Sequence, residues 1–176
     1  PPADMVEGYY VSKNVSGDNL TKRTNIEARI NEMGEIYLVS SLYGKSIKHT
    51  KLRAVAGDST VETEAVPYDN ARNYRFKDGG TPVEMVTFRK ADCDTLCQFI
   101  ADNVAKDIKV EFVGSKKYSL PLPSKTKNLI AETYTFATHK AQLKKAEDLK
   151  LYYMRKLQIT RKQSRQTATN IKGDAK

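Results

Sequence analysis

Short apolar runs separated by turn signals fill most of the first 120 residues. The runs are rich in β-branched and aromatic residues, and several of them alternate between apolar and polar side chains, which is typical of strands. Gly and Asn-rich breaks between the runs indicate turns. The pattern predicts strands at 35–42, 46–55, 60–66 and 107–113, whereas 26–33 fits either a strand or one or two helical turns.

One pair of runs carries a specific hairpin signal. Tyr74-Arg75-Phe76 precedes Lys77-Asp78-Gly79-Gly80, and an apolar-polar run follows at 82–89. Asp-Gly supplies the positive φ that a tight two-strand turn requires. The sequence therefore predicts an antiparallel hairpin here.

Two segments instead show helical spacing of their apolar residues. Asp92 is expected to cap a helix from Cys93 to about Val104. Ser124 is expected to begin a longer helix that continues to about Ile159, whose first part, through about residue 141, packs on the sheet. Between the two helices, Pro121 and Pro123 exclude a central strand.

This order of elements predicts an α+β fold. We expect an antiparallel sheet of about six strands with a mid-chain helix and a long C-terminal helix, and the alternative is a β-sandwich with a helical extension. The predicted organisation is a poorly structured segment at 1–25, an α+β body at 26–141, a basic helical extension at 142–160 and a disordered basic tail at 161–176.

Charge separates the body from the end of the chain. The net charge is +9, and residues 140–176 contribute +8 of it, with eleven Lys and Arg against three Asp and Glu. A basic arm of this kind suits an anionic partner such as nucleic acid, an acidic membrane surface or an acidic protein. The alternative is a solvated helix face followed by a solubilising tail.

The residues that we predict to form a binding arm are mostly cations with an aromatic ring among them. Aromatic rings between cations can stack on bases, while the cations contact phosphates. The predicted arm consists of Lys140, Lys144, Lys145, Lys150, Tyr152, Arg155, Lys156, Arg161, Lys162 and Arg165.

Cys93 and Cys97 are the only two cysteines. Four residues apart on a helix, their Cα atoms lie about 6 Å apart, a distance that a disulfide permits. Three interpretations are open: a disulfide, which indicates an oxidising compartment, two buried reduced thiols, or a redox pair with a thiol pKa lowered by the helix N-terminus.

Catalytic and metal chemistry have few candidates. His49 and His139 are the only histidines, and we expect His49 at an exposed strand position and His139 on a helix face. Glu62 and Glu64 share one side of a predicted strand but fit a solvated face equally well. We predict no catalytic set, no metal site and no cofactor.

The sequence leaves two principal classes of function, and an enzyme that uses the carboxylates or His49 is a minor third. The first is a non-enzymatic protein–protein interaction module, a processed periplasmic or exported component of a larger assembly, suggested by the start at Pro1 without Met, the cysteine pair and the ten Tyr. The second is a cytoplasmic nucleic-acid-binding accessory protein that uses the basic arm. No apolar run reaches the roughly 20 residues that span a bilayer.

Overall fold

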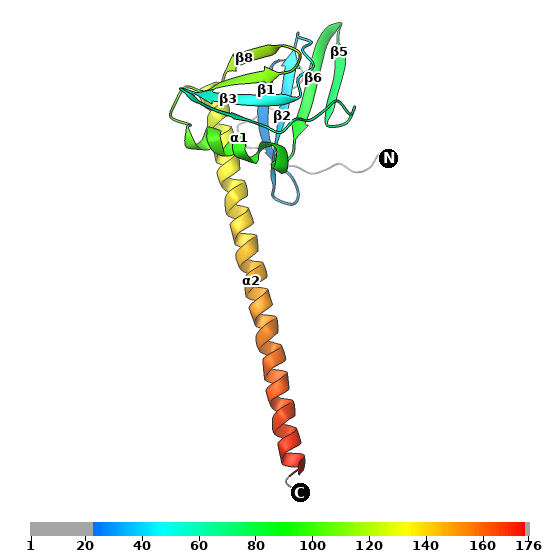
Figure 1. Cartoon of the computed structure of the whole chain (residues 1–176), viewed down its shortest axis with the longest axis vertical. Coiled ribbons are helices and arrows are strands. Elements are labelled where there is room, and N and C mark those ends of the chain that lie inside the picture. Colours follow the sequence, from blue (N-terminus) through cyan, green and yellow to red (C-terminus); the bar gives the residue numbers. More distant parts are fainter. Residues whose placement is uncertain (1–22, 175–176) are drawn as a thin grey trace. The chain divides into compact units, whose positions relative to one another are not determined.

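The computed structural model describes residues 23–174, with side chains through residue 173 (Figure 1). The segment expected to be poorly structured, 1–25, therefore lies almost wholly outside the described residues. The chain divides into two compact units, residues 1–138 and 139–176, and the helix α2 belongs to both.

The first unit is an α+β structure, as the sequence predicted. The eight strands of the described residues form two four-stranded sheets, both antiparallel, so the strands are more numerous than the expected six or so and do not share one sheet. Sheet A has the strand order β1-β2-β6-β5 and sheet B the order β4-β3-β7-β8. Their bounds are β1 Asn25–Ile30, β2 Ile36–Tyr43, β3 Lys51–Ala56, β4 Ser59–Glu62, β5 Asn73–Asp78, β6 Thr81–Phe88, β7 Lys109–Val113 and β8 Lys117–Pro121.

Glycine and proline residues account for the positions of two of the strand connections and edges. Gly79 and Gly80 have φ of +53° and +89° and join β5 to β6, which confirms the predicted hairpin. Only a residue without a Cβ adopts both conformations without strain. β8, which carries Pro121, lies at an edge of sheet B as the prolines required.

The two helices of this unit begin where polar residues precede an apolar pattern. α1 spans Lys90–Asp102, and α2 begins at Ser124, as predicted. Asp92 is not the N-cap of α1. It lies in the first turn, where its carboxylate accepts the backbone N–H of Arg89, the residue that caps the helix. The predicted N-cap lies three residues after the actual one. An acid in the first turn and an acid at the N-cap both accept hydrogen bonds from backbone N–H groups at the start of a helix, so the sequence alone does not distinguish them.

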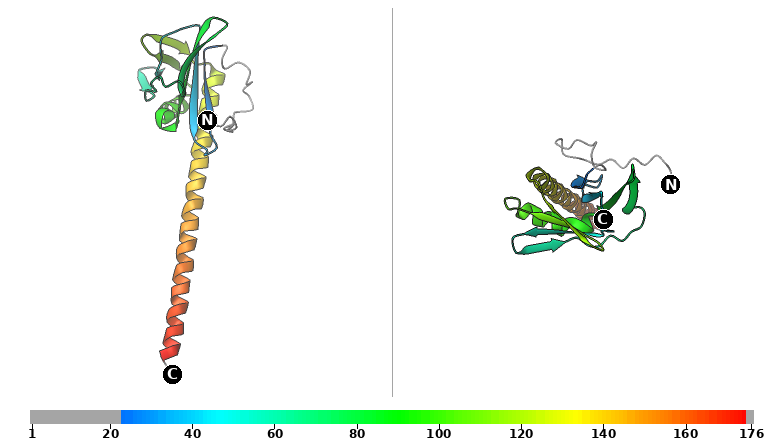
Figure 2. Two further views of the ribbon diagram at one scale, coloured as in Figure 1. Left: turned by 90° about the vertical axis from the view of Figure 1, so that its right-hand side faces the viewer. Right: turned by 90° about the horizontal axis from the view of Figure 1, so that it is seen from above.

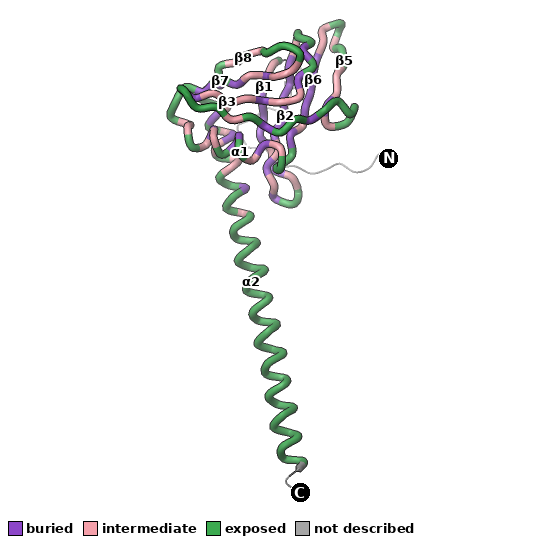
Figure 3. The backbone as a smooth tube through the Cα atoms, in the orientation of Figure 1, coloured by how far each residue is buried: buried purple, intermediate pink, exposed green. Residues whose placement is uncertain are grey.

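One hydrophobic core joins both sheets and both helices (Figures 2 and 3). Leu38 of β2 and Phe112 of β7 are fully buried in it, as are Leu96 and Ile100 of α1. Ile130 of α2 is also buried there, which shows that the first turns of α2 pack on the sheets as expected.

The described residues of the second unit, 139–174, are all helical. α2 runs Ser124–Asp174, so it continues well past Ile159, where the sequence pattern of apolar residues ended. Every side chain from residue 141 to 173 is exposed (Figure 3).

Candidate functional site

The segment 44–50 crosses from sheet A to sheet B without regular structure and carries His49. The sequence predicted a strand here, because Ile47, His49 and their neighbours alternate. Instead Lys48 takes a left-handed conformation, with φ of +58°, and the strand begins only at Lys51. We call 44–50 the crossover segment.

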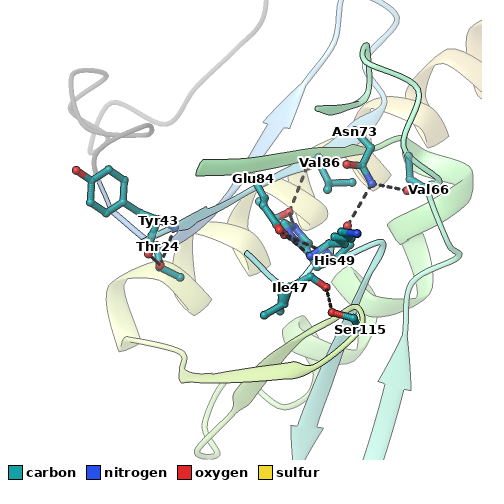
Figure 4. Close-up of polar contacts among 11 residues, drawn as sticks. Thr24, Tyr43, Ile47, His49, Val66, Asn73, Glu84, Val86 and Ser115 are labelled. Atoms are coloured by element: carbon teal, nitrogen blue, oxygen red, sulfur yellow. Dashed lines mark hydrogen bonds and ion pairs between the residues drawn. The ribbon is translucent and has the colours of Figure 1, made fainter. Parts of the chain in front are cut away.

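His49 stands at the centre of a buried polar network (Figure 4). Its Nδ1 lies 2.7 Å from Oε2 of Glu84, and its Nε2 lies 2.9 Å from Oγ of Ser40. The carboxylate of Glu84 also accepts the backbone N–H groups of Lys48, at 2.6 Å, and of His49, at 3.0 Å. Ser40 further donates to the carbonyl of Val86 at 3.3 Å.

The hydrogen bonds connect Glu84 to His49 and His49 to Ser40. A serine-hydrolase triad has the same connectivity, in which the acid orients the imidazole and the imidazole contacts the hydroxyl. Their exposed fractions are 0%, 0% and 2%. A nucleophile must have a reacting atom of its substrate about 3 Å away, and this hydroxyl is enclosed by the core. The array therefore holds the fold together and offers no access to a substrate.

The expectation of an exposed His49 was wrong. Its neighbours Lys48 and Lys51 suggested a solvated strand, but the partner that buries it, Glu84, lies 35 residues away in the sequence. Burial raises the pKa of Glu84, and the hydrogen bonds from the His49 side chain, then from the backbone of His49 and Lys48, outweigh it, so the pKa falls below the usual 4.5. The carboxylate is thus held ionised.

Two further contacts hold the crossover segment against both sheets. Nδ2 of Asn73, at the start of β5, donates to the carbonyl of His49 at 3.2 Å and to that of Val66 at 2.7 Å. From sheet B, the hydroxyl of Ser115 donates to the carbonyl of Ile47 at 2.9 Å (Figure 4). The network is therefore a clamp between the two sheets.

Gly114 allows this close approach. A Cβ at this position would lie 2.1 Å from the carbonyl oxygen of Ile47 and 2.7 Å from the backbone nitrogen of His49. Both neighbours are backbone atoms that cannot rotate away. The glycine is required for packing, because any side chain would push the crossover segment off β7.

The structure decides between the three interpretations of the cysteine pair. Cys93 and Cys97 are both free, fully buried, and 4.0 Å apart, about twice the length of an S–S bond. Both thiols lie on the face of α1 that packs into the hydrophobic core. Sγ of Cys93 donates a hydrogen bond to the carbonyl of Phe88 at 3.5 Å. A disulfide is therefore not formed.

The redox interpretation also fails for Cys97. The hydrogen bond with Cys93 and then burial raise the pKa of its thiol well above the usual 9.0. A reactive thiol needs the opposite shift and access to solvent. The pair is part of the apolar core.

The ten residues of the predicted binding arm all lie on α2, in its second unit. Nine of them are exposed, and Lys140 is half-buried. Nζ of Lys156 lies 5.1 Å from the centroid of the Tyr152 ring, a cation–π contact. From residue 149 to 173 the helix carries seven Lys and Arg and no Asp or Glu.

The most unusual feature of this helix was not predicted from the sequence. Residues 149–159 contain seven large apolar side chains, each 49–56% exposed. Leu149, Tyr153 and Leu157 recur at helical spacing, yet no residue of the described chain covers them. We call this set the apolar collar: Leu149, Leu151, Tyr152, Tyr153, Met154, Leu157 and Ile159.

A groove of about 790 Å³ also lies on the outer face of sheet A. Tyr37, Val39, Tyr74 and Met85 are among the residues that line it, and its rim carries both cations and acids. The mixed rim gives no preference for a ligand of either charge. No group of three or more potential metal ligands occurs among residues 23–173.

Comparisons with protein-family models, with curated proteins and with solved structures gave no significant match. Neither described helix is long and apolar enough to cross a membrane.

Proposed function

We propose that this chain is a non-enzymatic interaction module, which binds a protein partner through residues 149–173 of α2 as a component of a larger assembly. The observation that supports this most is the exposure of the apolar collar. Seven large apolar side chains within eleven residues, each about half exposed, form an apolar surface much denser than isolated surface hydrophobes.

The helix itself gives a second reason. Most helices in proteins owe their stability to the packing of one face against other elements. Residues 141–173 bury no side chain in the described structure. A partner that covers the collar supplies the packing that this helix lacks.

Binding of nucleic acid through the basic arm is the second candidate. The acid-free stretch 149–173 and the Tyr152–Lys156 contact favour it, because phosphates bind cations and bases stack on aromatic rings. Phosphate contacts would leave Leu149, Leu151 and Leu157 in water. A protein partner covers these side chains as well as the cations, and we therefore prefer it.

For its location we propose a periplasmic or exported setting. The free thiols remove one argument for that setting, because buried reduced cysteines also suit a reducing compartment. The proposal is tested by fractionating the source cells: recovery of the chain with the cytosol would reject it.

Photo-crosslinking in the source cells tests the interaction. The full chain is produced with benzoylphenylalanine in place of Tyr152 or, as a matched control, of Tyr68. Both tyrosines are 51% exposed, but Tyr68 lies on the first unit. We expect a discrete, protease-sensitive adduct from position 152 and none from position 68.

Three outcomes would reject a protein partner. The first is an adduct from position 152 that nuclease removes, which would indicate nucleic acid. The second is the absence of any adduct from position 152, and the third is the same set of adducts from both positions.

A further inference from the structure

We infer that the partner is an acidic protein that encloses the apolar collar on all sides, an inference that rests on the proposed function. The shape and charge of the partner are inferred from three features of the stretch: the directions of the apolar side chains, the charge of the same residues, and the length of the collar.

The collar surrounds the helix instead of forming a stripe. Successive residues of an α-helix are rotated by about 100°. On that basis the seven side chains of the collar leave no gap wider than about 80° around the axis. A helix that is apolar on every side is normally buried within other elements.

This distribution selects the shape of the partner. A bilayer surface accepts a helix whose apolar residues share one face and whose cations lie opposite. Here Leu149 and Leu151 point about 160° apart, so a flat surface covers only one of them. A deep groove, or a bundle into which the helix inserts, covers both.

The charge of the stretch selects the partner's chemistry. Lys150, Arg155 and Lys156 lie among the collar residues, and no acid occurs between 149 and 173 to neutralise them. A second copy of residues 149–173 would offer these cations no acidic partner. An acidic rim around an apolar groove pairs with the cations while the groove covers the collar.

The collar also sets the length of the contact. Eleven residues of helix extend about 16 Å, so an enclosing partner needs to cover three helical turns. The cations that follow, Arg161, Lys162 and Arg165, extend the acidic complement beyond the apolar groove.

A crosslinker scan around the helix tests the enclosure. Benzoylphenylalanine is placed singly at Leu149, Leu157, Leu151 or Ile159, which point in four directions spaced by about 80° to 120°. We expect the same protein adduct from all four positions. Adducts from neighbouring directions alone would reject enclosure and leave the protein interaction standing, whereas no adduct from any position would reject both.

A charge-reversal pair tests the acidity. Lys150→Glu with Lys156→Glu is compared with Lys116→Glu with Lys117→Glu, which changes the net charge equally at two exposed positions of the first unit. We expect the adduct yield to fall by about tenfold or more for the first pair only. Equal yields from both pairs would reject an acidic partner, and circular dichroism verifies that both variants keep their helix.

The adduct itself gives an independent measurement. The crosslinked peptide of the partner is isolated from the four scan positions and sequenced. We expect it to contain more Asp and Glu than Lys and Arg. A basic or neutral peptide would overturn the inference even if all four positions crosslink.

Discussion

Replacing Glu84 by Gln tests whether the buried network, and not apolar packing alone, holds the crossover segment. The two side chains have nearly the same shape, so the change removes a charge and one acceptor without creating a cavity. Oε1 of Glu84 accepts Lys48 N–H, and Oε2 accepts both His49 N–H and His49 Nδ1. An amide group has only one oxygen for these three donors.

The expected loss follows from this count. In its best orientation, the oxygen of the substituted amide still accepts the two hydrogen bonds from His49. The NH₂ group of that amide then faces the N–H of Lys48, so this backbone donor has no acceptor. A buried donor left without a partner costs about 1–3 kcal/mol, and hydrogen bonds to a charged acceptor are each stronger by roughly 1 kcal/mol. Together these give a loss of about 3–5 kcal/mol.

Urea unfolding, followed by near-ultraviolet circular dichroism of the buried aromatic residues, measures this loss. Glu62→Gln is the matched control, since the Lys51–Glu62 pair spans 3.4 Å with side chains 37% and 45% exposed. Such a pair contributes about 0–1 kcal/mol. A free energy of unfolding for Glu84→Gln within about 1 kcal/mol of the control would refute the reasoning.

Three further outcomes follow from the same region and its surroundings. The pKa of Glu84 is lowered from 4.5 in the folded state, so its contribution to stability is complete above pH 4.5 and is lost as the pH falls through the folded pKa. At pH values below about 4.5, the urea concentration at the unfolding midpoint of the parent protein should therefore decrease. Glu84→Gln should lack this part of the decrease. Gly114→Ala should lower the free energy of unfolding by at least about 2 kcal/mol in the same urea assay, because its Cβ would overlap the backbone of Ile47, and an unchanged midpoint would contradict the close approach. Protein prepared without reductant should show two free thiols when denatured and none that react within minutes when folded, because Cys93 and Cys97 are buried and the pKa of Cys97 is raised; a count of zero after denaturation would contradict the free cysteines.

Local signals in the sequence predicted the parts of this fold that local chemistry decides. Asp78-Gly79-Gly80 predicted the hairpin because the turn's conformation is encoded in those residues alone. Ser124 predicted the start of α2, and the α+β class followed from the order of such elements. The division into two sheets could not be predicted, because it depends on which distant strands pair.

The sites were harder to predict for the same reason. Nothing near His49 in the sequence indicates that Glu84 buries it, and polar neighbours suggested exposure. For α2 the sequence predicted a basic arm but not the collar, because apolar residues at helical spacing, such as Leu149 and Leu157, usually form a packed face. Apolar spacing shows where a helix has apolar sides, whereas the tertiary structure shows whether they are covered.

The clamp on the crossover segment also bears on how the chain reaches its native state. It joins residues far apart in sequence: Lys48 to Glu84 across 36 residues, and Ile47 to Ser115 across 68. Closing such loops costs entropy before any contact forms, and folds rich in long-range contacts fold slowly. The hairpin of β5 and β6 forms from neighbouring residues and needs no such closure. Joining of the two sheets at His49 is therefore expected to limit the folding rate, so that replacing Glu84 slows folding more than it speeds unfolding.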